Sequence, residues 1–156
     1  MPAITPCLWF DRDAEDAAKL YVSLFPNSKI TKVSRYPDGL PGDRAGEVLT
    51  VEFELDGKIF TGLNGGPQFP HSEAISFQIY VKDQAELDRY WDGLIAGGGE
   101  ESQCGWLKDR FGVSWQVVPE KLGQWMSNPK TSSGVGPALM SMTRLDIAAL
   151  EKAAAG

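Results

Sequence analysis

The chain has 156 residues, enough for one domain or for two small modules that share a sheet, and its net charge at pH 7 is −6. An acidic chain without a basic patch argues against nucleic acid or an anionic membrane as a partner, and no apolar run approaches the ~20 residues of a membrane span. The residues before Cys7 lack the basic and apolar parts of a secretion signal, so we expect a cytoplasmic location. Cys7 and Cys104 share no spacing motif, which predicts two reduced thiols.

The first half of the chain follows the order strand, helix and three strands. Residues 4–10 form a short apolar run of strand type, and Asp13 is expected to cap a helix that ends before Pro26. Apolar residues within this helix recur on one face. Three further strands are predicted over residues 29–36, 47–55 and 58–64. Asp56-Gly57, between the last two, is a strong signal for a two-residue hairpin turn.

The second half repeats this order. Residues 74–81 form a strand, Asp83 and Glu86 have the spacing of a capping box, and Gly97-Gly98-Gly99 ends the second helix. Shorter strands follow over residues 101–104, 106–108 and 113–118. The last two flank a charged turn in which Gly112 is free to adopt a positive φ.

This repetition predicts an α+β fold made of two βαβββ modules. We place the modules at residues 3–66 and 73–119, followed by a helical tail over residues 120–156, all within a single domain spanning residues 1–156. Each module is expected to be a curved sheet with a helix on its outer face, and the two sheets are expected to face each other around a cleft. The tail is predicted as a helix over 120–126, a break rich in Pro, Gly and Ser, and helix over roughly 138–154, where Asp146 could cap a last short helix. An unrelated α+β sandwich is the alternative.

Several segments carry a family likeness. The longest is CGWLKDRFGVSWQVVP, residues 104–119, and the others are residues 4–11, 21–28, 51–57, 63–67 and 74–77. Together they resemble PhnB-like proteins, a family labelled demethylubiquinone methyltransferase-like, within the glyoxalase/bleomycin resistance/dioxygenase (vicinal oxygen chelate) superfamily. Residues 140–153 also look like the C-terminal helix of that family. The resemblance implies a glyoxalase-like fold and, as is common for this architecture, a homodimer.

The resemblance also implies where a metal would lie. Enzymes of the wider superfamily usually hold one divalent ion through His and Glu side chains on the strands that face the cleft. That pattern places Thr5, Thr61, Ser76 and Gln116 at the ligand positions. Hydroxyl and amide groups are poor ligands for Zn, Fe or Ni, so we expect no metal and no other cofactor.

Two further points bear on this expectation. A one-residue slip would replace Thr61 by Gly62 or Asn64. His71 is the only histidine, and it lies in a loop outside the strand pattern. A single histidine without clustered partners is far more often a surface residue than a metal ligand.

The cleft is instead expected to bind a small, partly aromatic molecule through aromatic and small polar groups. Alternation along the first strand groups Cys7 and Trp9 with Thr5, and along the fifth strand it groups Gln78 with Ser76. The candidate ligand-binding residues are Thr5, Cys7, Trp9, Thr61, Asn64, Ser76, Gln78, Cys104 and Gln116. The alternative for the aromatic residues, including Trp9, Phe77 and Trp115, is that they are core. For each cysteine, an inert small residue is favoured over a nucleophile.

Three functions are consistent with these residues. The first is a metal-free binding or catalytic cleft for a small molecule. The second is a divalent-metal-dependent isomerase, lyase or dioxygenase whose ligands lie one residue away from the predicted positions. The third is a methyltransferase, as the family label implies, although the glycine clusters lack the spacing of a phosphate loop. Whether the protein is an enzyme, and which ligand it binds, stay open at this point.

Overall fold

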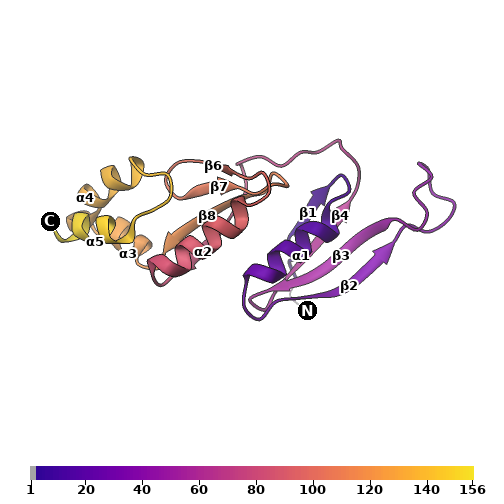
Figure 1. Cartoon of the computed structure of the whole chain (residues 1–156), viewed down its shortest axis with the longest axis horizontal. Coiled ribbons are helices and arrows are strands. Elements are labelled where there is room, and N and C mark those ends of the chain that lie inside the picture. The colour runs from indigo at the N-terminus through magenta and orange to yellow at the C-terminus, as the bar shows by residue number, and fades with distance from the viewer. Residues whose placement is uncertain (1–2) are drawn as a thin grey trace. The chain divides into compact units, whose positions relative to one another are not determined.

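The computed structural model describes residues 3–156 and contains two four-stranded sheets, each packed against a helix (Figure 1). The strand order is β1-β4-β3-β2 in the first sheet and β5-β8-β7-β6 in the second. The chain divides after His71 into two compact units. Two βαβββ modules followed by helices confirm the predicted α+β fold class.

The first module contains one helix and four strands. Its elements are β1 (Cys7–Phe10), α1 (Ala14–Leu24), β2 (Lys29–Arg35), β3 (Val48–Leu55) and β4 (Lys58–Asn64). Strands β1 and β4 are parallel, and the other neighbouring pairs are antiparallel. Helix α1 buries a face that includes Ala14 and Tyr21, and Tyr21 packs on Phe53 of β3. Asp56 and Gly57 both have positive φ, as the predicted hairpin turn requires.

The second module repeats this plan with shorter strands. Its elements are β5 (Ser76–Val81), α2 (Gln84–Ile95), β6 (Glu100–Glu101), β7 (Trp106–Lys108) and β8 (Ser114–Pro119). One half of the predicted capping box is present, because the Glu86 amide donates to the Asp83 carboxylate. The Glu86 carboxylate accepts from the amide of Lys82, one residue before the N-cap. Gly97, with φ of 79°, follows the end of α2 as expected.

The β7–β8 hairpin is organised by the carboxylate of Asp109, which is only 3% exposed. Its Oδ1 accepts from the amides of Phe111 and Val113, and its Oδ2 accepts from the indole Nε1 of Trp115 at 2.9 Å. A buried carboxylate needs such donors to replace water. Gly112 has φ of 88°, which agrees with the prediction that it supplies the positive φ of this turn.

The tail differs from the prediction. It forms three helices, α3 (Leu122–Ser127), α4 (Pro129–Met140) and α5 (Ile147–Ala155). The segment predicted as a break is helical because Asn128 caps its first turn and Pro129 occupies the N1 position, where proline is tolerated. Gly134 lets α5 approach closely, since a Cβ there would lie 2.4 Å from the Ala153 carbonyl oxygen.

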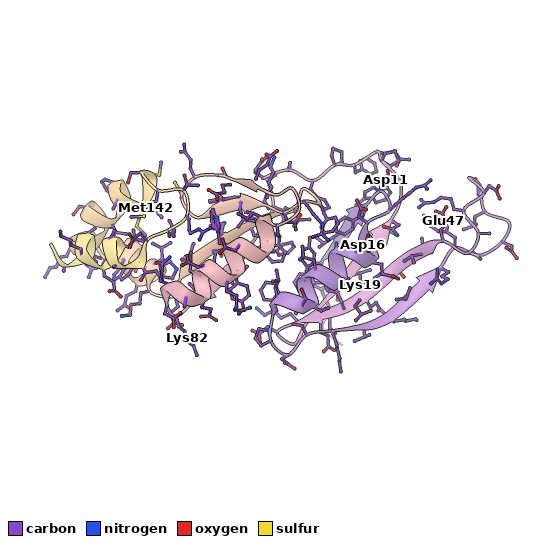
Figure 2. The ribbon with its side chains drawn as sticks, viewed as in Figure 1. Asp11, Asp16, Lys19, Glu47, Lys82 and Met142 are labelled. Carbon is purple, nitrogen blue, oxygen red and sulfur yellow. The ribbon has the colours of Figure 1, made fainter. Side chains whose placement is uncertain are left out.

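The prediction of one long helix over roughly residues 138–154 is also wrong. The chain leaves α4 at Ser141, and Asp146 begins α5 by accepting a hydrogen bond from the Ala149 amide. This agrees with the suggestion that Asp146 caps a short last helix. In the connecting segment, the carbonyl oxygen of Met142 (Figure 2) accepts a hydrogen bond from the Cys104 amide.

The tail packs on its own module. The Gln84 side chain at the start of α2 bonds the Leu145 carbonyl and the Ile147 amide, and Arg144 pairs with Asp88 and Asp92 of α2. Leu145 is only 1% exposed. The tail is therefore held against α2 of its own module by hydrogen bonds and ion pairs. Within residues 3–156, no helix is long and apolar enough to cross a membrane.

Two details of the first module also differ from the sequence prediction. The first strand starts at Cys7, so Thr5 precedes it instead of lying on it. Asp13 is the N-cap residue of α1, but its side chain makes no cap hydrogen bond. The Ala14 amide donates instead to Oδ1 of Asn64 at 2.9 Å, because the parallel pairing of β1 and β4 brings the end of β4 beside the start of the helix.

Candidate functional site

In each module, the helix covers one face of the sheet, and the opposite face is called its helix-free face here. On the first sheet, the register pairs Cys7 with Thr61, and both residues lie on the helix-free face. Gly62 and Asn64 point toward α1, where a Cβ on Gly62 would lie 3.2 Å from the Ala14 Cβ. Of Thr61, Gly62 and Asn64, the one that lies on the helix-free face is Thr61.

Trp9 follows Cys7 on this face and anchors the loop that leaves β4. Its Nε1 donates to the Gly66 carbonyl at 2.8 Å. Its ring packs edge-on against the Phe69 ring, with 4.9 Å between the ring centroids. The ring also lies against Gly65, since a Cβ at that position would come within 2.3 Å of it. Trp9 is half-buried, so it has a structural role and also retains some accessible ring surface.

Asn64 has a structural environment. It is 3% exposed, its Oδ1 accepts from Ala14, and its Nδ2 donates to the Val48 carbonyl at 3.1 Å. The hydroxyl of Tyr36 donates to the Asn64 carbonyl. The side chain thus joins the end of β4 to α1 and β3 and does not face Cys7 and Thr61.

The environment of Cys7 disfavours its thiolate. The residue is exposed overall, but partial burial of its side chain raises the pKa of the thiol. A raised pKa leaves less thiolate at neutral pH, and the thiolate is the nucleophilic form. Thr5 lies before the strand and is half-buried.

On the second sheet, the helix-free face presents a pair of neutral polar groups. Nε2 of Gln116 on β8 donates to Oγ of Ser76 on β5 at 2.9 Å. Gln78 is the register partner of Gln116 and accepts a hydrogen bond from the Tyr80 hydroxyl at 2.9 Å. Three of the predicted residues, Ser76, Gln78 and Gln116, are therefore neighbours on one face.

Two further residues of this face, Trp106 and Lys108, were not predicted from the sequence. Trp106 on β7 lies opposite Gln116, and Lys108 lies opposite Ser114. Lys108 forms an ion pair with Glu73. The two predicted hairpin strands carried enough information to find Trp106 and Lys108, because alternation in β7 with this register fixes their side. The position of Glu73 depends on the path of a loop.

Cys104 lies outside the strands, in the turn before β7, with φ of 62°. Its Sγ lies 3.6 Å from Sδ of Met140 in α4. The aromatic residues divide between the two expected roles. Trp115 is core, at 3% exposure, and its ring lies 5.3 Å from that of Phe77, whereas Trp106 is half-buried on the helix-free face.

These positions do not suit the metal ion of the wider superfamily. Thr61, Ser76 and Gln116 offer only hydroxyl and amide groups, and Gln116 turns a donor nitrogen toward Ser76. His71 packs its ring 5.2 Å from Phe10. Among residues 3–156, no three His, Cys, Asp or Glu side chains gather in a group that could hold an ion.

Comparison with known proteins gives a consistent family. Residues 2–118 match the family model described as 3-demethylubiquinone-9 3-methyltransferase. A PhnB protein from Bacillus cereus is 30% identical, with 75% of this chain and 99% of that chain covered and a TM-score of 0.67. A search of curated proteins finds no match.

Two further solved structures are similar in fold alone. A protein from Pseudomonas aeruginosa is 20% identical over 76% of this chain and 98% of its own, with a TM-score of 0.63. The fosfomycin resistance protein FosX from Mesorhizobium loti is 12% identical over 81% of this chain and 98% of its own, with a TM-score of 0.57.

Proposed function

Since the chain belongs to the 3-demethylubiquinone-9 3-methyltransferase family, and is PhnB-like with a vicinal oxygen chelate fold, we propose that it binds a small, partly aromatic molecule without a metal ion. The ligand would be recognised by shape and by hydrogen bonds from neutral side chains. The helix-free face of the second sheet is the better-defined candidate site.

The hydrogen bond from Gln116 to Ser76 is the observation that carries the proposal. It uses one of the two amide hydrogens of Gln116 and one lone pair of Ser76. The second amide hydrogen, the amide oxygen and the hydroxyl hydrogen can still serve polar groups of a ligand. Because each group holds the other in place, the pair is oriented before a ligand arrives, which lowers the entropic cost of binding.

An aromatic surface adjoins this polar pair. Trp106 is the register partner of Gln116 on the neighbouring strand, and side chains directly opposite each other on one face lie about 5 Å apart. An indole beside a hydrogen-bonding amide suits a planar molecule that carries oxygen atoms. On the first module, Cys7, Trp9 and Thr61 are proposed as ligand-binding residues of its own helix-free face.

A metal-dependent enzyme is the second candidate, and one observation favours it. Glu52 of β3 is the register partner of Thr61, which places a carboxylate on the helix-free face of the first sheet. Lys32 of β2 is in turn the register partner of Glu52, so the side-chain ammonium of Lys32 lies beside that carboxylate. Elemental analysis separates the two candidates, because a bound ion at one equivalent per chain would overturn the metal-free proposal.

The proposal is tested by native mass spectrometry of the purified protein, followed by extraction and identification of any co-purified molecule. We expect a small organic ligand whose retention falls in Gln116→Ala and Ser76→Ala. Gln124→Ala, which removes an exposed amide on α3, is the matched control and should retain the ligand. Equal retention in all variants would refute the role of the polar pair. Binding of S-adenosylmethionine, measured by calorimetry, would support the methyltransferase alternative instead.

We also propose that the protein is a homodimer, as the likeness to PhnB proteins implies. The exposed apolar side chains of Ile75 and Tyr80, at 73% and 57%, support association with another copy. Light scattering should give twice the chain mass of 17.0 kDa at micromolar concentrations, and a constant monomer mass would exclude the dimer.

A further inference from the structure

A small pocket lies on the second module beside the polar pair described above. Its volume is about 110 Å³, and its lining residues are Glu73, Glu100, Glu101, Ser102, Trp106, Leu107, Lys108 and Ser114. Complete small-molecule sites measure roughly 300 Å³ or more. This pocket therefore suits one functional group of a ligand, with the rest of the ligand outside it.

Ser114 in this pocket has a hydroxyl group without a partner. The residue is only 1% exposed, and no hydrogen bond to its Oγ is present among the described residues. Buried polar atoms in native proteins nearly always have a partner, whether protein, water or ligand. The unpaired hydroxyl thus favours a polar partner at this position, and this observation is independent of the charges around it.

The cation of the pocket is held by a weak internal partner. Lys108 lies directly opposite Ser114 in the β7–β8 register, and its ammonium pairs with the carboxylate of Glu73. Hydrogen bonding to Glu73 raises the pKa of Lys108, and the same bond lowers the pKa of Glu73, so both groups are charged at neutral pH. The two side chains are 34% and 57% exposed, and ion pairs at that exposure contribute little and open easily.

We propose that Lys108 and Ser114 form a subsite for an anionic group of the ligand, a carboxylate or a phosphate, and that the Glu73 carboxylate pairs with the Lys108 ammonium until the ligand displaces it. The ammonium supplies the charge and the hydroxyl supplies a hydrogen bond, a combination that suits an oxyanion. This inference rests on the proposed function, because the aromatic part of the same ligand would contact Trp106.

The other carboxylates of the lining do not form an equivalent site for a cation. Glu101 turns its Oε1 toward the indole Nε1 of Trp91 on the helix-covered side, at 3.3 Å. Glu100 is the register partner of Lys108 and faces the same ammonium. A cationic ligand would have to approach Lys108 directly, whereas an anion exchanges one carboxylate partner for another.

Three probes of similar shape and different charge test the subsite: benzoate, benzamide and benzylamine. Binding is followed by tryptophan fluorescence and calorimetry in wild type, Glu73→Gln, Lys108→Met and Ser114→Ala. Glu73→Gln removes the internal competitor, so benzoate should bind about two- to fivefold more tightly, as expected for loss of an exposed ion pair. Benzamide should be unaffected. Lys108→Met and Ser114→Ala should each weaken benzoate relative to benzamide.

Several results would overturn the subsite. These are equal effects of Glu73→Gln on benzoate and benzamide, tighter binding of benzylamine than of benzoate, and no benzoate binding by Glu73→Gln at tens of millimolar. A merely structural Ser114 would lower the melting temperature when changed to Ala without altering the preference for benzoate. If benzoate and benzamide bind alike in every variant, the anionic subsite fails while binding of an aromatic ligand stands. If the co-purified ligand is retained equally in wild type, Gln116→Ala and Ser76→Ala, the proposed function itself fails.

Discussion

The carboxylate of Asp109 should be the most sensitive polar group of the second module, and Asp109→Ala tests this. The substitution leaves the Val113 amide and the Trp115 indole buried without an acceptor, at distances now of 3.1 and 2.9 Å from the carboxylate. Each buried donor left unpaired costs about 1–3 kcal/mol, so the two together should lower the free energy of unfolding by about 2–6 kcal/mol. The Phe111 amide should add less, because it is only partly buried and water can reach it.

Asp109→Asn is the matched variant. Its amide oxygen can keep the two backbone donors, but its NH₂ group would face the Trp115 indole, so one donor should be lost at a cost of about 1–3 kcal/mol. Urea unfolding followed by tryptophan fluorescence and far-UV circular dichroism measures both variants. Asp109→Ala within about 0.5 kcal/mol of wild type, the range usual for a surface substitution, would refute the role assigned to this carboxylate.

Three further predictions concern the first module. Gly65→Ala should destabilise it and shift the tryptophan emission, since the new Cβ would come within 2.3 Å of the indole ring beneath it, and unchanged emission would contradict that contact. Asn64→Ala should lower the free energy of unfolding in urea by about 0.5–2 kcal/mol through loss of the α1 cap, and further through loss of the hydrogen bond to the Val48 carbonyl. Asp13→Ala should cost less because its side chain makes no cap bond, and the reverse order would contradict this assignment. In a Cys104→Ser background, Cys7 should react with iodoacetamide more slowly than free cysteine at pH 7.5, because burial raises its pKa and fewer thiolates are present at that pH; an equal or faster rate would contradict a raised pKa.

Local signals predicted most of the fold. Capping by Asp83, the Asp56-Gly57 turn and the positive φ of Gly112 each depend on a few neighbouring residues, and all three are present. The tail was mispredicted because Pro, Gly and Ser usually interrupt helices. There, Pro129 stands at a helix start and Gly134 allows close packing of α5, and neither context is visible in a single sequence.

The candidate site was predictable only as far as strand alternation reaches. Alternation groups Ser76 with Gln78 along β5, but the face shared with Gln116 and the bond between Gln116 and Ser76 depend on the pairing of β5 with β8. Asn64 shows the limit of the approach. The superfamily pattern admitted Asn64 as an alternative to Thr61, whereas the structure shows its side chain accepting from the Ala14 amide at the start of α1. Asp109 was missed for the same reason, because its three donors are brought together by the hairpin.

Ligand binding through Lys108 and ligand binding through the Gln116–Ser76 pair should respond differently to salt. Lys108 is about one-third exposed, so its attraction for an anionic group is screened as ionic strength rises above 0.1 M, where the Debye length is about 10 Å. The hydrogen bonds offered by Gln116 and Ser76 carry no net charge and should be nearly independent of salt. The affinity of Glu73→Gln for benzoate should therefore fall toward its affinity for benzamide as salt is added, and the latter should stay constant. A benzoate affinity that ignores salt would mean that the ammonium does not contact the ligand, and recognition would then depend on the neutral pair alone.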